Sequence, residues 1–161
     1  MLKEPKIKGL RKKGRNFWVA AVLENASKDC PIEIMETEDT LFILYTSGSI
    51  GKPKGMLHTT AGCRVDTAYT FKTYFNIERE SDVYWCTVDI GWITGYRYIV
   101  YGPLCNRATS VIFEGMPSYT DCGRFWDIVE KHKITPFYTA STAIRALAKK
   151  TPVNTRDLSS L

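Results

Sequence analysis

Hydrophobic residues along the chain fall into short continuous runs that alternate with stretches of helical spacing. Runs with the length of buried strands occupy residues 41–45, 83–86, 109–113 and 137–139. Apolar positions at helical spacing predict helices over residues 16–27, 59–75, 92–101, 121–132 and 142–150. This alternation predicts an α/β fold, with a parallel or mostly parallel sheet and helices on its faces.

Ligands of open parallel sheets bind beyond the carboxyl ends of the strands, so loops that directly follow a strand are candidates for chemistry. Three such loops occur here, at residues 46–55, 87–95 and 139–142. We therefore expect the functional residues to lie in these loops.

Composition restricts the class of protein. The chain has 161 residues, of which 44% are hydrophobic, enough for one domain with a packed core. No apolar run approaches the roughly 20 residues that span a bilayer, so no membrane partner is expected. The net charge is +5, but residues 1–15 carry seven basic side chains and one acid. Since residues 16–161 are close to neutral, we expect no nucleic-acid partner and assign residues 1–15 to a basic linker or loop.

The five cysteines are dispersed and form no C-x-x-C pair, and only two histidines accompany them. This spacing predicts no metal site. An odd, scattered set of cysteines is typical of reduced thiols inside a cell. We expect an intracellular protein, cytoplasmic in the simplest case, with mitochondrial and nuclear locations left open.

Residues 45–55 form the loop with the most specific chemistry. They read Y-T-S-G-S-I-G-K-P-K-G, with three hydroxyls, three glycines and two lysines after a predicted strand. Glycines let successive backbone N–H groups converge on an anion, and lysines add charge-assisted hydrogen bonds. A flexible surface turn is the alternative. A Walker A loop is excluded, because Thr46 stands where its first glycine is required and Pro53 follows Lys52.

Longer motifs narrow the chemistry by resemblance. The 45–55 loop resembles the phosphate loop of adenylate-forming enzymes, which include acyl-CoA synthetases, luciferases and peptide-synthetase adenylation domains. Residues 85–95, W-C-T-V-D-I-G-W-I-T-G, resemble the W-C-T-A-D-x-G-W-x-T-G signature of acetyl-CoA synthetases. Shorter matches follow in the same order at residues 101–104, 113–115, 138–140 and 142–145. The resemblance covers about residues 14–161, and propionyl-CoA synthetase is the relative most easily confused with it.

The resemblance implies a partial AMP-binding (adenylation) domain over residues 16–161, an incomplete subdomain of the adenylate-forming fold. Such enzymes activate acetate with ATP and Mg²⁺ to acetyl-adenylate and pyrophosphate, then transfer the acetyl group to coenzyme A. The residues implied to hold the ATP phosphates are Thr46, Ser47, Gly48, Ser49, Gly51, Lys52 and Lys54.

The same resemblance implies an acetate pocket at Trp92, Ile93 and Thr94, and coenzyme A contacts at Thr94, Ser118 and Ala140. Without the resemblance, Trp92 and Ile93 are read as ordinary core residues. Asp89 would be read as a cap for the helix that follows it.

Several positions depart from the family pattern. Ile50 replaces a hydroxyl residue in the phosphate loop, and Ser141 replaces a proline. Tyr96 and Arg97 stand where the family has histidine and a small residue. Arg107 replaces a glycine before the third predicted strand, at a turn that we expect to need a positive φ.

Other family parts have no counterpart in these residues: the adenine-binding segment, the Thr-Glu pair that serves ATP and magnesium, the ribose-binding Asp and the mobile domain with the adenylation lysine. We therefore expect no complete catalytic set and no full activity from the chain alone. The alternative is an inactive product that acts as a binding module or has no function. A truncated sheet would also leave an edge open to self-association.

Overall fold

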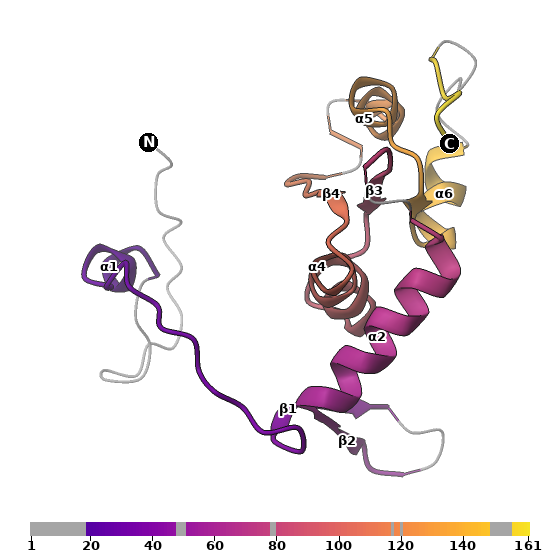
Figure 1. Ribbon diagram of the computed structural model, residues 1–161. Coiled ribbons are helices and arrows are strands. Elements are labelled where there is room, and N and C mark those ends of the chain that lie inside the picture. Colours follow the sequence, from indigo (N-terminus) through magenta and orange to yellow (C-terminus); the bar gives the residue numbers. More distant parts are fainter. Residues whose placement is uncertain (1–18, 48–50, 78–79, 117, 120, 149–155) are drawn as a thin grey trace. The chain divides into compact units, whose positions relative to one another are not determined.

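The computed structural model describes residues 19–47, 51–77, 80–116, 118–119, 121–148 and 156–161. The chain divides into two units, Met1–Ile34 and Met35–Leu161. In the first unit the described residues contain the short helix α1 (Val19–Glu24), which buries no side chain (Figure 1). Within the described residues the helix predicted over residues 16–27 ends at Glu24, and its described side chains are exposed.

A three-stranded parallel sheet lies at the centre of the second unit. Strand β3 (Val83–Cys86) is the middle strand, between β4 (Thr109–Val111) and β5 (Phe137–Tyr138). Both neighbours run parallel to β3, with Val83 opposite Thr109 and Trp85 opposite Phe137. These strands confirm the predicted parallel sheet, although β4 and β5 are shorter than expected.

One face of this sheet packs against helices α5 (Arg124–His132) and α6 (Ser141–Ala148) (Figure 1). Successive side chains of a strand point to opposite faces, and Trp85 points to this one. Its indole is fully buried and meets the ring of Phe125 at 5.1 Å between centroids. Val129 and Leu147 complete this side of the core.

The opposite face packs against α2 (Thr60–Phe75) and the π-helix η1 (Tyr96–Tyr101). Tyr84 and Cys86 point to this face because they alternate with Trp85 along β3. The Tyr84 ring lies 4.8 Å from Phe71 and 4.9 Å from Phe75, and it is fully buried. Helices therefore cover both faces of the sheet, as the sequence predicts for an α/β fold.

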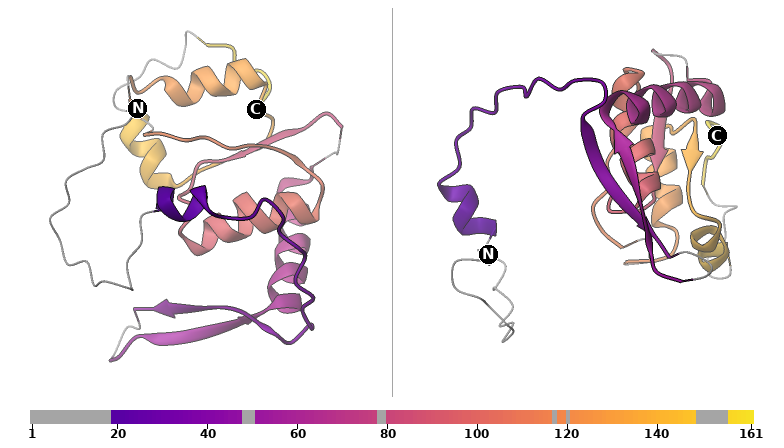
Figure 2. Two further views of the ribbon diagram at one scale, coloured as in Figure 1. Left: turned by 90° about the vertical axis from the view of Figure 1, so that its left-hand side faces the viewer. Right: turned by 90° about the horizontal axis from the view of Figure 1, so that it is seen from below.

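A separate antiparallel hairpin precedes α2 along the chain. It consists of β1 (Thr40–Thr46) and β2 (Lys54–Thr59), and it extends from the end of α2 where that helix begins (Figures 1 and 2). The prediction of a buried strand at residues 41–45 is wrong, because Ile43 is 55% and Tyr45 69% exposed. The prediction also missed β2. This strand begins with Lys54 and Gly55 and contains few of the β-branched and aromatic residues that favour strands.

The helix predicted over residues 92–101 continues further. It comprises α3 (Ile93–Gly95), the π-helix η1 and α4 (Gly102–Cys105). Gly102 packs closely against α2, because a Cβ there would be 2.7 Å from Phe71 Cδ2 of α2 and also 2.7 Å from the Arg97 carbonyl oxygen of η1. A glycine followed by proline suggests a helix end from sequence, but here the glycine permits close helix packing.

The start of one helix and the conformation of one turn can be compared with their predictions. Helix α5 begins at Arg124, three residues later than predicted. Arg107, at the turn before β4, has φ = 55°, which confirms that this position adopts the left-handed conformation usual for glycine.

Candidate phosphate loop and neighbouring site

The candidate phosphate-binding residues lie at the tip of the hairpin. Thr46 ends β1 directly opposite Lys54, the first residue of β2. Ser47, Gly51 and Lys52 lie between the strands and are exposed, as are Thr46 and Lys54. Two of the predicted phosphate-binding positions, Gly48 and Ser49, lie outside the described residues, as does Ile50.

The chemistry of the hairpin suits an anion. Gly51 has φ = +104°, a conformation that L side chains rarely adopt, so the turn needs a glycine there. Residues 44–58 contain two lysines and no carboxylate. The exposed ammonium groups of Lys52 and Lys54 therefore meet no competing acid within the hairpin, and the residues present fit a polyphosphate.

Hydrogen bonds fix the base of the hairpin to the start of α2. The Thr59 hydroxyl accepts the Gly62 N–H at 3.3 Å and caps the helix. Thr60 is buried and donates both its backbone N–H and its hydroxyl to the Asp39 carbonyl oxygen, at 2.8 and 3.0 Å. The hairpin is thus joined to a 16-residue helix that packs on the parallel sheet.

Aromatic contacts link the hairpin to the candidate acetate pocket. The Phe42 ring stacks on His58 at 4.7 Å between centroids and lies 5.6 Å from Tyr96. His58 therefore pairs with Phe42 across the two strands. Tyr96 immediately follows α3, which contains Ile93 and Thr94.

The turn before α3 is held by Asp89. Its carboxylate accepts the Gly91 N–H at 2.7 Å, and its carbonyl oxygen accepts the Trp92 N–H at 3.1 Å. The N-cap of α3 is Trp92, with no side-chain cap, so the reading of Asp89 as the helix cap is wrong. A Cβ on Gly95 would clash with the Asp89 carbonyl, so the turn packs against a helix position that only glycine fits.

The three candidate residues of the acetate pocket differ in how far they are exposed to solvent. Trp92 is 69% exposed, so the alternative reading of this indole as a core residue is wrong. Ile93 and Thr94 are half-buried. A wall of a pocket would have such intermediate exposure.

The candidate coenzyme A residues lie at separate places. Ala140 is exposed and directly precedes α6, where its carbonyl oxygen accepts the Ala143 N–H at 3.0 Å. Ser118 is exposed in the segment between β4 and α5. No hydrogen bond among the described residues joins Ser118 to Thr94 or Ala140.

A pair of hydroxyl groups not predicted from the sequence connects the ends of β3 and β5. The Thr87 hydroxyl donates to the Thr139 hydroxyl at 2.6 Å, and the Thr87 N–H donates to the Tyr138 carbonyl at 3.0 Å. Each threonine directly follows a strand, and this shared position was the signal available in the sequence.

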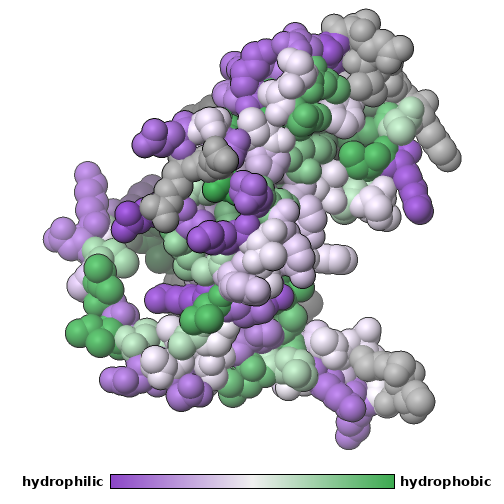
Figure 3. Space-filling model, turned by 45° about the vertical axis from the view of Figure 1, so that its right-hand side comes forward, coloured by the Kyte–Doolittle hydropathy of each residue, from purple (hydrophilic) through white to green (hydrophobic). Residues whose placement is uncertain are grey.

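A groove of about 660 Å³ opens beyond the carboxyl ends of β3 and β4. The groove is mainly apolar, and its acidic residues are Asp89 and Glu114. The residues that line the groove are Cys86, Thr87, Val88, Asp89, Ile90, Ile99, Val111, Ile112, Phe113, Glu114, Gly115 and Phe125. Trp92, Ile93 and Thr94 do not line it. Apolar side chains also reach the surface at several other places (Figure 3).

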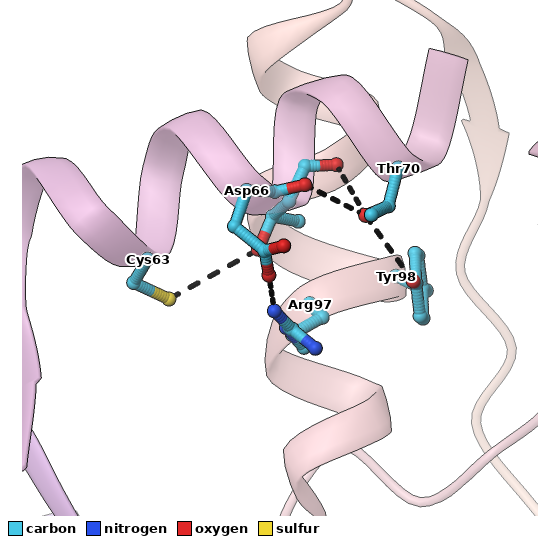
Figure 4. A network of polar contacts seen from close by, with 6 residues as sticks. Cys63, Asp66, Thr70, Arg97 and Tyr98 are labelled. Carbon is cyan, nitrogen blue, oxygen red and sulfur yellow. Dashed lines mark hydrogen bonds and ion pairs between the residues drawn. The ribbon is translucent and has the colours of Figure 1, made fainter. Parts of the chain in front are cut away.

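A polar network joins α2 to η1 (Figure 4). Arg97 forms an ion pair with Asp66, and the Tyr98 hydroxyl donates to the Thr70 hydroxyl at 3.3 Å. The Thr70 hydroxyl in turn donates to the Asp66 carbonyl oxygen at 2.8 Å. Arg97 departs from the family pattern, and its ion pair with Asp66 gives it a structural role.

Burial favours the neutral, protonated forms of three side chains on β3 and β5. It raises the pKa of the Cys86 thiol and of the Tyr84 and Tyr138 hydroxyls. Cys86 is therefore a poor nucleophile. The described residues contain no group of three or more His, Cys, Asp or Glu side chains that could hold a metal ion.

None of the helices in the described part of the chain has the length and apolar character required to cross a bilayer.

Comparison with known proteins identifies relatives of one kind. Residues 3–161 match the family of AMP-binding enzymes. The acetyl-coenzyme A synthetase of Leptospira biflexa is 58% identical over 141 residues, which are 86% of this chain and 21% of that protein. Acetyl-coenzyme A synthetase 2 of Pseudomonas aeruginosa is 55% identical over 150 residues, 92% of this chain and 23% of the relative. The Bartonella quintana enzyme is 58% identical over 135 residues, with coverages of 84% and 21%.

The chain therefore spans about a fifth of the length of these curated relatives. Because the family match covers nearly every residue and includes the β1–β2 hairpin, the chain belongs to the family of AMP-binding enzymes.

Proposed function

We propose that this chain is a segment of an acetate–coenzyme A ligase and supplies that enzyme's polyphosphate-binding loop. The observation that carries the proposal is the hairpin tip, where Lys52 and Lys54 are exposed beside a turn glycine and no carboxylate competes for them. The relatives named acetyl-coenzyme A synthetase support acetate as the acyl substrate.

The proposed reaction has two steps. An acetate oxygen attacks the α-phosphorus of ATP, forming acetyl-adenylate as pyrophosphate leaves. The coenzyme A thiol, after losing its proton, then attacks the acetyl carbonyl carbon and AMP leaves. Lys52, Lys54 and the hairpin hydroxyls would hold the β- and γ-phosphates and then the pyrophosphate, with Mg²⁺ carried by the nucleotide.

We further propose that Trp92, Ile93 and Thr94 border the acetate methyl group, and that Thr94, Ser118 and Ala140 lie along the coenzyme A path. Half-buried Ile93 and Thr94 support the first assignment. The Thr87–Thr139 hydrogen bond supports the second, because it fixes the strand end from which Ala140 follows. Five free cysteines support an intracellular location.

These 161 residues alone are proposed to be insufficient for adenylation. The described residues supply phosphate ligands and a candidate acyl pocket, but no described cationic group is assigned to the α-phosphate, where the negative charge develops. A binding module without catalysis is the second candidate function, favoured by the wide exposure of apolar side chains.

Acetate-dependent release of pyrophosphate from MgATP tests the insufficiency. We expect the purified chain to release no more pyrophosphate than Lys52→Ala. Release by the unmodified chain that disappears in Lys52→Ala would show that the adenylation step is complete in these residues, and would contradict this part of the proposal. Lys28→Ala, an exposed lysine outside the hairpin, is the matched control.

A further inference from the structure

We propose that Arg124 is a positioning residue for coenzyme A, because its guanidinium fixes the loop that presents Ser118. The inference rests on the proposed function, which takes Ser118 as a contact of coenzyme A. Arg124 would act through the loop between β4 and α5, and not by touching the ligand.

The guanidinium of Arg124 lies on an aromatic ring that the core holds in place. Its Cζ is 4.7 Å from the centroid of the Phe113 ring, a cation–π distance. That ring meets Trp85 at 5.8 Å and Phe125 at 6.1 Å between centroids, edge to face in both cases. Since Trp85 and Phe125 are buried, the core sets the position of the ring and hence of the charge above it.

From this position the guanidinium reaches the loop between β4 and α5. Its Nη1 donates a hydrogen bond to the Tyr119 carbonyl oxygen at 2.9 Å. The Tyr119 N–H in turn donates to the Met116 carbonyl oxygen at 3.2 Å, which closes a turn around the exposed residue Ser118. The hydrogen bond from Arg124 therefore holds the turn in which the proposed coenzyme A contact lies.

The backbone beside Arg124 is shaped to admit the guanidinium. Gly115 has φ = +135°, a conformation that L side chains rarely adopt. A Cβ at this position would lie 3.4 Å from Arg124 Nη1 and 3.6 Å from Phe113 Cζ. The chain thus passes close to the cation and its ring at a position that needs glycine for its conformation.

The two carboxylates closest to Arg124 in the sequence have other partners. Asp127 pairs with Arg156, and the Asp121 carboxylate accepts the Gly123 N–H. Among the described residues no ion pair joins either acid to Arg124. The charge of Arg124 therefore strengthens its hydrogen bond to the loop carbonyl.

A loop that is ordered before the ligand arrives gives tighter binding, because less conformational entropy is lost on association. Loss of the Arg124 contacts would leave that ordering to coenzyme A. We therefore expect substitution of Arg124 to free the loop and to weaken coenzyme A binding together.

The test measures two properties of the whole chain: hydrogen exchange of the Tyr119 amide by NMR, and the affinity for coenzyme A by isothermal titration calorimetry. Arg124→Met keeps an apolar side chain on Phe113 but removes the charge and the donor. It should speed this exchange and weaken coenzyme A binding, each about tenfold or more, because a charge-assisted hydrogen bond is lost.

Two further variants separate positioning from a general effect of the substitution. Arg124→Lys retains a cation and a donor and should recover most of both properties. Lys131→Met, at an exposed position of the same helix, also removes one positive charge and is the matched control. It should change neither the exchange nor the affinity.

Unchanged Tyr119 exchange or unchanged coenzyme A affinity in Arg124→Met would overturn the inference. So would an original chain that does not bind coenzyme A, or an Arg124→Met variant that loses magnesium pyrophosphate binding to the same extent. Coenzyme A binding that depends on Arg124, in a chain whose hairpin does not bind magnesium pyrophosphate, would support the inference and count against the proposed polyphosphate loop alone.

Discussion

Arg107 adopts a left-handed backbone conformation, which is unfavourable for residues other than glycine. Its φ of 55° lies in the left-handed region, which costs a residue with a Cβ about 1 kcal/mol or more. The turn still forms because the Ala108 N–H donates to the Pro103 carbonyl at 2.9 Å and β4 pairs immediately afterwards. Packing of the flanking elements therefore determines this conformation.

Replacing Arg107 with glycine should stabilise the fold. We expect the free energy of unfolding to rise by about 1 kcal/mol, because glycine adopts positive φ without steric cost. Urea denaturation measures the change. Arg64→Gly, at an exposed position inside α2, should instead lower stability by about 1 kcal/mol. Equal effects of the two substitutions would contradict the assignment of strain to Arg107.

The buried thiol of Cys86 makes the free energy of unfolding depend on pH in the alkaline range. Burial raises its pKa above the ordinary value of 9.0, so the folded state holds the thiol proton more tightly than the unfolded state. The resulting stabilisation is fully present below about pH 9 and is lost as the pH rises from there towards the folded-state pKa. Tyr84 and Tyr138, whose pKa values burial also raises, add to the loss at higher pH.

Urea denaturation at pH 7 and pH 10 should therefore show lower stability at pH 10. Replacing Cys86 with alanine should reduce this difference, since the titrating thiol is gone, whereas Cys105→Ala, at an exposed position, should leave it unchanged. A pH dependence identical in all three proteins would contradict the assignment to Cys86.

At the scale of elements, the sequence predicted the parallel strands well and the hairpin poorly. Trp85 and its neighbours form a continuous apolar run because both faces of β3 are covered by helices, so the run itself indicated a buried central strand. The run at residues 41–45 looks the same in sequence but belongs to a two-stranded ribbon with exposed residues. Periodicity alone does not tell these environments apart, because the difference lies in which elements pack against the strand.

Gly102 decides how closely η1 and α4 approach α2. We expect Gly102→Ala to lower the free energy of unfolding by about 1–3 kcal/mol, because its Cβ would overlap the Arg97 carbonyl oxygen and the Phe71 ring. Thermal or urea unfolding measures this loss. Leu104→Ala, at a 72% exposed position in the same helix, should change stability little. A Gly102→Ala variant as stable as the original chain would show that these helices can separate without cost.

The candidate site was predictable to the extent that its residues follow strands or form a local motif. Lys52 and Lys54 belong to such a motif, and Thr139 follows a strand. The Asp66–Arg97 ion pair was not predictable, because it joins α2 to η1 across 31 positions and depends on how those helices pack. The groove beside Ile112 likewise depends on the tertiary arrangement of β3, β4, η1 and α5.

Across the whole molecule, the unit Met35–Leu161 contains two structurally different parts, a parallel sheet covered by helices and an antiparallel hairpin. The parallel sheet, with helices on both faces, forms a packed body around Trp85 and Tyr84. The hairpin carries the candidate phosphate-binding residues and contacts that body through α2 and the Phe42–Tyr96 ring pair. The proposed phosphate contacts therefore rely on local hairpin geometry, whereas the proposed acetate and coenzyme A contacts rely on the sheet.

Isothermal titration calorimetry with magnesium pyrophosphate measures directly whether this hairpin binds polyphosphate. Loss of one charge-assisted hydrogen bond costs about 1.5–3 kcal/mol, so Lys52→Ala should weaken binding about tenfold or more. Lys28→Ala should bind like the original chain. Equal affinities for the original chain and Lys52→Ala would contradict the claim that this hairpin is a polyphosphate-binding loop.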